Sequence, residues 1–205
     1  IAPFHSQLPV RISFGDGVVA ELCDVLAGRG GTALVVVEAP VAGHPDVVAA
    51  LAAAEAAGVG LERVVKDAGE PTFQLADELA GRVRAAAHGT VVGIGGGSAL
   101  DVAKAARIVA DQGGVGRDFA DGRLVPTPPT IGLVLCPTTS GTGSEVSGAS
   151  VLTDTDADVK IGFGHPNMRA QHALVDPVLT HGLPPAPTAH SGVDAMAQAI
   201  GACTV

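Results

Sequence analysis

Aromatic and basic side chains are both scarce in this sequence. It has no tryptophan and no tyrosine, and phenylalanine occurs five times, so the hydrophobic core has to be aliphatic. Lysine and arginine number 12 against 21 acidic residues, which gives a net charge of −9. Nucleic acids and anionic membranes need basic patches on their partners, and this charge balance argues against both. The expected partners are small molecules or another protein.

Cysteine is also rare. The three cysteines are far apart and odd in number, and no two form a Cys-x-x-Cys pair, which excludes a disulfide framework. Cys23 and Cys136 lie in apolar runs, so we expect buried thiols in a reducing compartment. No apolar run approaches the roughly 20 residues that span a bilayer, and no secretory signal pattern opens the chain. We therefore expect a soluble, cytoplasmic protein.

The apolar pattern alternates between short buried strands and amphipathic helices. Runs rich in β-branched residues predict strands at residues 9–14, 32–37, 61–65, 90–94, 131–136 and 174–176, the first of them alternating like an edge strand. Helical periodicity predicts helices at residues 18–28, 45–58, 73–87 and 98–110. This alternation predicts an α/β fold, a Rossmann-like parallel sheet with helices on both faces. Residues 111–129 are expected to be irregular, and residues 149–163 to form a β-hairpin.

The chain is organised around a glycine turn between a strand and a helix. Three glycines follow the strand at residues 90–94, namely Gly95, Gly96 and Gly97. Glycines let backbone N–H groups approach an anion closely, and the following helix adds its N-terminal N–H groups and dipole. Ser98 with Asp101 fits a capping box, which predicts a helix that opens at Ser98. The turn therefore suits a phosphate, although a strand-to-helix turn without a ligand fits the same residues.

A second loop concentrates hydrogen-bond donors. Residues 137–145 read Pro-Thr-Thr-Ser-Gly-Thr-Gly-Ser-Glu and contain no cation. A flexible linker has a similar composition, but a strand before the loop and an apolar stretch after it hold this loop in place. Ligands of parallel α/β sheets bind at the carboxyl ends of the strands, where Glu38, Gly95 and Pro137 all lie. Lys160, on the expected hairpin, is either solvated or within reach of such a ligand.

The proline-rich residues 183–187 are the best domain boundary in the chain. They divide a nucleotide-binding domain at residues 1–186 from the opening helix of a second domain at residues 187–205, which starts near Thr188. Asp194 and Gln198 are four residues apart on that helix and therefore share one face. Because the sequence lacks an initiating Met and stops inside this helix, we expect it to be part of a longer polypeptide.

Four stretches together resemble the iron-containing (group III) alcohol dehydrogenase family. They are Gly-Gly-Gly-Ser-Ala-Leu-Asp-Val-Ala-Lys at residues 95–104, the loop at residues 137–145, Leu-Val-Asp-Pro at residues 174–177 and Gly-Val-Asp-Ala at residues 192–195. They occur in the order of the family, and the resemblance runs through nearly the whole chain. It implies an N-terminal nucleotide-binding domain, a C-terminal all-helical domain of the dehydroquinate synthase-like architecture, and a nicotinamide and a divalent metal in the cleft between them. It also implies a homodimer.

The resemblance assigns cofactor contacts residue by residue. The glycine turn would hold the pyrophosphate, the threonines of the second loop would contact the phosphates and the nicotinamide ribose, and Lys160 and Leu179 would line the nicotinamide end. Glu38 would accept from the adenosine ribose hydroxyls, and a carboxylate there repels a 2′-phosphate, which favours NAD over NADP. Lys104 belongs to the pattern without an assigned contact. The cofactor residues so implied are Glu38, Gly95, Gly96, Gly97, Ser98, Thr138, Thr139, Thr142, Lys160 and Leu179.

The implied metal site departs from the family pattern. Where the resemblance implies Asp-x-x-x-His, this chain has Asp194 and Gln198, and the later histidines of the family fall beyond Val205. A glutamine amide oxygen is a harder and weaker ligand for iron or zinc than an imidazole nitrogen. Asp194 fits a metal ligand and also a plain carboxylate in the first turn of a helix. His190 is a weaker replacement, since the first turn of a helix points its side chains differently.

Three functions are compatible with these residues. The leading hypothesis is an NAD-dependent alcohol dehydrogenase or aldehyde reductase, in which hydride passes between nicotinamide and a carbon whose oxygen a divalent metal polarises. The second is a metal-independent or altered-metal reductase of an aldehyde that bears an acidic group. The third is a nucleotide-binding relative without turnover. A lyase or synthase of the dehydroquinate synthase type is disfavoured, because the loop at residues 137–145 and the stretch at residues 174–177 resemble the dehydrogenases. No residue of the chain is a convincing general base, so the catalytic residues stay unassigned.

Overall fold

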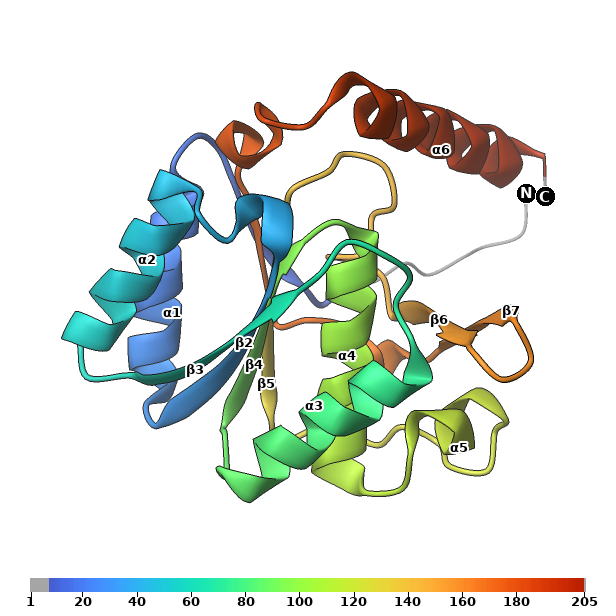
Figure 1. Ribbon diagram of the computed structural model, residues 1–205, viewed down its shortest axis with the longest axis horizontal. Coiled ribbons are helices and arrows are strands. Elements are labelled where there is room, and N and C mark those ends of the chain that lie inside the picture. Colours follow the sequence, from blue (N-terminus) through green and yellow to red (C-terminus); the bar gives the residue numbers. More distant parts are fainter. Residues whose placement is uncertain (1–7, 205) are drawn as a thin grey trace.

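A parallel sheet forms the centre of the computed structural model, which describes residues 8–204 (Figure 1). Its six strands lie in the order β1-β8-β5-β4-β2-β3, and every neighbouring pair is parallel. A separate antiparallel hairpin is formed by β6 and β7. The predicted α/β fold with helices on both faces is confirmed, and so is the position of the first strand at an edge.

The bounds of the elements follow the predicted pattern closely. The strands are β1 (Arg11–Phe14), β2 (Thr32–Glu38), β3 (Gly60–Lys66), β4 (Thr90–Gly95), β5 (Gly132–Pro137), β6 (Ala149–Asp154), β7 (Val159–Gly164) and β8 (His172–Val175). The α-helices are α1 (Leu22–Arg29), α2 (Pro45–Ala56), α3 (Phe73–Ala85), α4 (Gly97–Gln112), α5 (Gly116–Ala120) and α6 (Pro185–Cys203). Short 3-10 turns lie at Val18–Glu21, Ala39–Val41, Pro166–Met168 and Pro177–Thr180.

The core consists of two aliphatic layers, one on each face of the sheet. In β2, Val35 and Val37 pack with α1 and α2, whereas Leu34 and Val36 pack with α3 and α4. Alternate residues of a strand point to opposite faces, so a continuous β-branched run buries side chains in both layers. Each such side chain contributes about 1.5–3 kcal/mol when it is fully buried. The helix α4 stabilises this arrangement, because its nine consecutive residues from Val102 to Ala110 are all buried.

The start of α4 differs from the prediction. The helix begins at Gly97, its N-cap is Gly96, and no side chain caps it. The capping box of Ser98 with Asp101 is therefore wrong. Asp101 instead accepts hydrogen bonds from Ser144 Oγ at 2.6 Å and from the Val151 N–H at 2.9 Å, both far away in the sequence. A capping box is predicted from the spacing of nearby residues alone. Here the carboxylate of Asp101 instead accepts hydrogen bonds from residues that are distant in the sequence.

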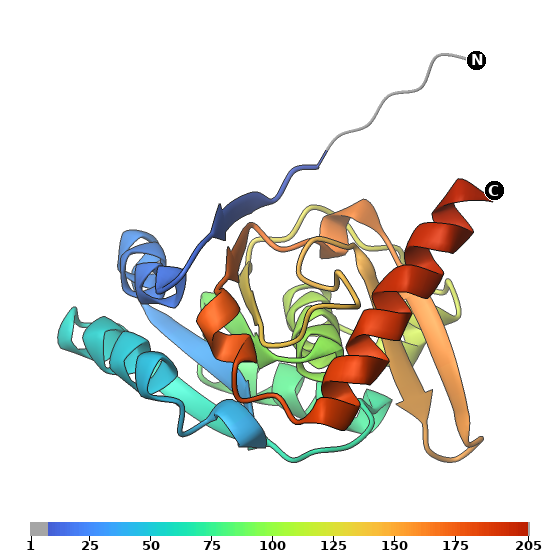
Figure 2. The ribbon, with the colours of Figure 1, turned by 90° about the horizontal axis from the view of Figure 1, so that it is seen from above.

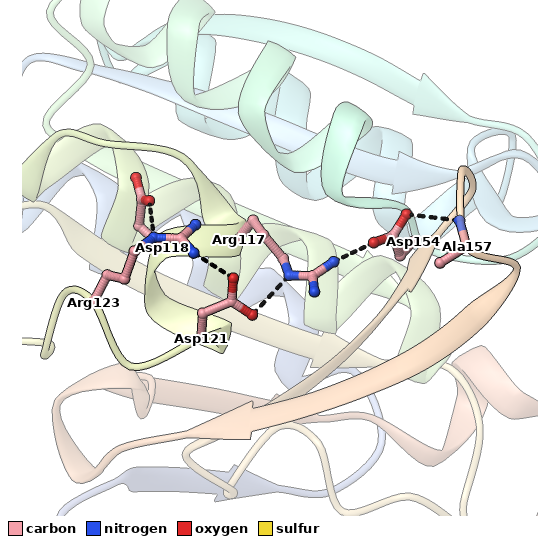
Figure 3. A network of polar contacts seen from close by, with 6 residues as sticks. All are labelled: Arg117, Asp118, Asp121, Arg123, Asp154 and Ala157. Atoms are coloured by element: carbon pink, nitrogen blue, oxygen red, sulfur yellow. Dashed lines mark hydrogen bonds and ion pairs between the residues drawn. The ribbon is translucent and has the colours of Figure 1, made fainter.

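The segment at residues 111–129, predicted to be irregular, contains the short helix α5. A chain of ion pairs connects this helix to the hairpin (Figure 3). Arg117 on α5 pairs with Asp121 at 2.8 Å and reaches Asp154 at the end of β6. Asp154 in turn accepts the Ala157 N–H at 3.2 Å and so closes the hairpin turn. The glycine and proline content of the segment hid this helix from the sequence interpretation, and the contact of Arg117 with Asp154 depends on a residue outside the segment.

Replacing Arg117 with alanine is expected to lower the melting temperature slightly. Arg117 is solvent-accessible, and exposed ion pairs contribute little. The loss should shrink further in about 1 M salt, where the Debye length falls to about 3 Å. Thermal unfolding of both proteins at low and high salt measures this. A large loss that salt does not change would show that packing, rather than charge, holds α5 to the hairpin.

The C-terminal helix α6 lies across the edge of the sheet at which the strands end (Figures 1 and 2). It begins at Pro185 and not near Thr188, since proline is well suited to the first turn of a helix, where its missing N–H has no partner to lose. No described residue of α6 is buried. Its apolar residues Val193, Met196 and Ile200 are 61% to 65% exposed. No helix within residues 8–204 is long and apolar enough to cross a membrane.

The three cysteines lie in three different environments. Cys136 is buried in β5, as predicted, whereas Cys23 is only half-buried, which corrects the prediction for that residue, and Cys203 is exposed. Burial raises the pKa of the Cys136 thiol to about 12, and Asp176 adds to the shift. We expect a thiol reagent at pH 8 to modify Cys203 quickly and Cys136 only after unfolding, because the thiolate is the reactive form. Mass spectrometry of the labelled peptides would test this, and rapid labelling of Cys136 would contradict it.

Candidate nucleotide site

A cavity of about 740 Å³ lies at the carboxyl ends of β2 and β4, and residues of α6 form part of its lining. It is bounded by the end of β2, the glycine turn, the loop after β5, the hairpin and α6. Nine of the twelve predicted site residues line it, namely Glu38, Gly96, Gly97, Ser98, Thr139, Thr142, Lys160, Asp194 and Gln198. Residues from five separate segments of the chain therefore meet around one space.

The other three predicted residues lie behind the wall of the cavity. Gly95 is the last residue of β4, and its carbonyl accepts the Thr138 N–H at 2.9 Å. Thr138 itself is buried. Leu179 packs in the core layer of α1 and α2 instead of lining the cavity. These three residues therefore pack behind the residues that line the cavity and do not line it themselves.

The glycine turn and the loop after β5 are in close contact. A Cβ at Gly97 would lie 2.8 Å from Thr142 Cγ2, and one at Gly96 would lie 3.3 Å from Thr139 Cγ2. Gly95 has φ +153°, and a Cβ there would lie 2.8 Å from both Ala99 Cβ and Glu38 Cβ. Such distances leave no room for a side chain. Glycine is therefore needed here for the approach of two backbones as well as for access of an anion.

Glu38 makes a contact that the sequence did not predict. Its Oε2 accepts the Gly96 N–H at 2.9 Å, so a carboxylate now uses one of the N–H groups of the turn. The two residues lie at the ends of adjacent parallel strands, β2 and β4. A phosphate that bound Gly96 would compete with this carboxylate. Two other residues that line the cavity, Lys160 and Glu70, form an ion pair at 3.0 Å, and both side chains are exposed.

Lys104 is fully buried and joins α4 to the loop after β5. Its Nζ lies 3.0 Å from Asp101 Oδ1 and donates to the Ser144 carbonyl at 3.0 Å and to Ser147 Oγ at 3.3 Å. Burial lowers the pKa of Lys104, while the charges of Asp101 and Glu145 act in the opposite direction. The sequence interpretation assigned no contact to this residue. In the sequence near Lys104, the only indication of this ion pair was that Asp101 lies one helical turn before it.

Sequence reasoning missed several other residues that line the cavity, among them Glu70, Asp101, Ser144 and Ser147. Glu70 follows the carboxyl end of β3, so the rule that located Glu38 and Gly95 could also have located it. The other three could not be found in this way. They reach the cavity only because the loop folds back onto α4.

Asp194 and Gln198 lie side by side, one turn apart, on the face of α6 that lines the cavity. Gln198 Nε2 donates to Asp194 Oδ2 at 3.0 Å. After rotation of the amide, both side chains would offer oxygen donors to a divalent cation, so they fit two ligands of such an ion. Within residues 8–204 no group of three or more His, Cys, Asp or Glu side chains is placed to hold a metal.

A second cavity, of about 480 Å³, lies beside α5 and does not share residues with the first. Its charged group, Asp111, accepts the N–H groups of Thr130 and Ile131, each at 3.0 Å. Burial alone would raise the pKa of Asp111, but these hydrogen bonds outweigh it and the pKa is lowered. Gln112 is likewise bonded to Thr127 through both ends of its amide. These polar groups are satisfied within the protein, so this cavity offers no group to a ligand.

The geometry defines a class of protein. A glycine turn at a helix N-terminus, an acidic residue at the end of the neighbouring strand and a cavity at the carboxyl ends of a parallel sheet are the arrangement of dinucleotide-binding α/β domains. The sequence profile described as "Iron-containing alcohol dehydrogenase" matches residues 9–177. The chain belongs to the iron-containing alcohol dehydrogenase family.

Individual relatives agree with this assignment. The sulfoacetaldehyde reductase of Bilophila wadsworthia is 40% identical over 131 residues, which are 64% of this chain and 34% of that protein. The choline dehydrogenase of Bacillus subtilis is 32% identical over 208 residues, which are 98% of this chain and 51% of that protein. The chain thus spans about half the length of that relative and less of others.

Solved structures show the same fold. The sulfoacetaldehyde reductase of Bifidobacterium kashiwanohense in complex with NAD+ matches with a TM-score of 0.87 at 29% identity, over 97% of this chain and 53% of that one. An archaeal halo-thermophilic alcohol dehydrogenase from a Red Sea brine pool matches with a TM-score of 0.85 at 30% identity, over 94% of this chain and 50% of that one. These similarities cover the sheet and the site described above.

Proposed function

We propose that this chain is the nucleotide-binding part of an NAD-dependent alcohol dehydrogenase or aldehyde reductase. The observation that carries the proposal is the convergence of the glycine turn, Glu38, the hydroxyl loop and Lys160 on one cavity. The relatives support it, since their names describe reductases and dehydrogenases of small alcohols and aldehydes, and one of their structures contains NAD+. The substrate in this proposal is an alcohol or an aldehyde.

In this proposal, different residues of the cavity bind different parts of the cofactor. The N–H groups of Gly97 and Ser98, at the positive end of the α4 dipole, hold the pyrophosphate, and the Gly96 N–H joins them when the phosphate displaces the carboxylate of Glu38. Thr139 and Thr142 donate hydroxyls to the phosphates and the nicotinamide ribose, and Lys160 supplies a cation at that end. Glu38 disfavours a 2′-phosphate, so NAD is preferred to NADP.

Asp194 and Gln198 supply two oxygen ligands to a divalent metal, iron or zinc, in this proposal. A metal held by these two residues would supply Lewis-acid polarisation of the substrate oxygen. The cofactor residues proposed above line the same cavity as Asp194 and Gln198 and would position the nicotinamide there. A metal-independent reductase is the second candidate, and the hydrogen bond of Gln198 to Asp194 at 3.0 Å is the observation that favours it, because it satisfies the carboxylate without an ion.

Two further proposals concern the whole protein. The exposed apolar side chains of α6 support a helical second domain that begins near residue 187 and packs on Val193, Met196 and Ile200. The strand β1 lies at the edge of the sheet with Ile12 and Phe14 exposed, which supports a homodimer formed across this edge.

Metal content and turnover of the whole protein test the proposal together. Elemental analysis should find iron or zinc in stoichiometric amount, and NADH oxidation with short aldehydes should stop after chelation and return with the metal. Turnover in a metal-free protein that a chelator does not affect would favour the metal-independent reductase. NADH binding without turnover on any aldehyde, with or without metal, would contradict both.

A further inference from the structure

We propose that Lys104 is a positioning residue for the cofactor. It holds the hydroxyl loop, defined here as residues 138–147, against α4, so that Thr139 and Thr142 face the glycine turn. The proposal deepens the function proposed above and rests on it for the identity of the ligand. The anchoring itself rests only on the contacts of Lys104 and its neighbours.

The bonding partners of the Lys104 ammonium lie on its own helix, at the far end of the hydroxyl loop and at the first residue of β6. The side chain is 0% exposed. Its Nζ donates to the Ser144 carbonyl, to Ser147 Oγ and to the Ala149 carbonyl, and it pairs with Asp101. An ammonium group has three N–H donors, and a buried one is tolerated only when it is paired and hydrogen-bonded. Lys104 therefore fixes three points of the segment that follows the threonines.

Asp101 completes this anchor from the preceding turn of the helix. Its Oδ1 accepts Ser144 Oγ at 2.6 Å, and its Oδ2 accepts the Val151 N–H of β6 at 2.9 Å. Its carbonyl accepts Ser150 Oγ at 3.0 Å. One ion pair on α4 thus connects the end of the hydroxyl loop and the start of the hairpin to a single helix.

The first turn of the same helix contacts the front of the hydroxyl loop. Thr142 Cγ2 would lie 2.8 Å from a Cβ at Gly97, which shows how closely the loop approaches the glycine turn. The Thr138 N–H bonds the Gly95 carbonyl at 2.9 Å. The hydroxyl loop is therefore bonded at its front end to β4 and at its far end to α4. Release of the far end would let Thr142 move away from the glycine turn, which opens the site.

Arg107 provides a matched control on the same helix. It is also 0% exposed, and its Nη2 donates to the carbonyls of Asn167 at 2.9 Å and Arg169 at 3.2 Å. Neither of these residues lines the cavity. Lys104→Met and Arg107→Met both remove a buried cation from α4 and leave backbone carbonyls without their donor. Only the first removes bonds to the hydroxyl loop.

Two measurements on the whole protein test the proposal, namely amide hydrogen exchange of residues 138–147 and titration of NADH. Both variants should melt at lower temperature. Lys104→Met should speed exchange in the hydroxyl loop and raise the Kd for NADH by roughly tenfold or more, because misplaced contacts lose binding steeply. Arg107→Met should leave the exchange of the loop and the Kd for NADH as in wild type. Ser150→Ala is a milder second variant for the case that Lys104→Met does not fold. It removes only the hydrogen bond from Ser150 Oγ to the Asp101 carbonyl. We expect it to raise the Kd for NADH by about threefold.

The proposal is overturned if Lys104→Met, or Ser150→Ala in its place, leaves both loop exchange and NADH affinity unchanged. It is equally overturned if Arg107→Met weakens NADH binding as much as Lys104→Met, because loss of stability alone would then explain the effect. A wild-type protein that does not bind NADH would refute the proposed function instead. In that case faster loop exchange in Lys104→Met alone would still establish the anchor.

Discussion

Replacement of Gly95 with alanine is expected to abolish tight NADH binding and to destabilise the fold. The residue has φ +153°, and the new Cβ would lie 2.8 Å from Ala99 Cβ and from Glu38 Cβ, neither of which can rotate away. Overpacking and backbone strain of this kind cost about 1–3 kcal/mol each. Relief of the clash would displace the glycine turn, so the Kd for NADH should rise by more than about tenfold. Thermal unfolding and NADH titration measure the two effects.

Gly81→Ala is the matched control for this experiment. Gly81 lies inside α3, and a Cβ there would meet nothing within 4 Å. Alanine is the better helix former by about 1 kcal/mol, so this variant should be as stable as wild type or more so, with NADH binding unchanged. If Gly95→Ala behaved like Gly81→Ala, the glycine turn would not be the close-packed binding element described here.

Replacement of Glu38 with glutamine is expected to change the choice between the two nicotinamide cofactors. The variant keeps an oxygen that can accept the Gly96 N–H and removes only the charge. A unit charge within several ångströms of a phosphate is worth more than about 1 kcal/mol at an effective dielectric constant of about 20. The Kd for NADPH should therefore fall by about tenfold relative to that for NADH. Paired titrations of both cofactors measure the ratio.

Glu55→Gln is the control for the charge itself. Glu55 lies on α2, pairs with Arg63 at 2.7 Å and does not line the cavity. Its loss lowers the net negative charge by the same amount and should leave the ratio of the two Kd values unchanged. An equal change in both variants would mean that net charge, and not the position of Glu38, governs the preference.

The sheet could be predicted from the sequence because its signals are local. The β-branched run of β2 and the glycine turn after β4 each specify their own conformation within a few residues. The rules for parallel α/β folds predict that the strands are parallel and end at one edge of the sheet. The observed strand order places Glu38 beside Gly96, and no signal in the sequence predicted a bond between them.

The remaining features depend on contacts between distant segments. Asp101 matched a capping box by spacing, yet it bonds Ser144 and Val151, 43 and 50 residues away. Lys104 had no contact assigned to it from the sequence, and it is fully buried against the same distant segment. Leu179 packs in the core because the 3-10 turn at Pro177–Thr180 directs it inward. No local pattern contains this information.

Titration of NADH into the whole protein tests the central claim most directly. The chain has no tryptophan or tyrosine, so within its residues no fluorescence of those side chains overlaps the cofactor signal. We predict saturable binding with one NADH per cavity, an enhanced cofactor emission in wild type and in Gly81→Ala, and loss of both in Gly95→Ala. Absence of binding in wild type, or equal binding in Gly95→Ala, would contradict the assignment of this cavity as the cofactor site.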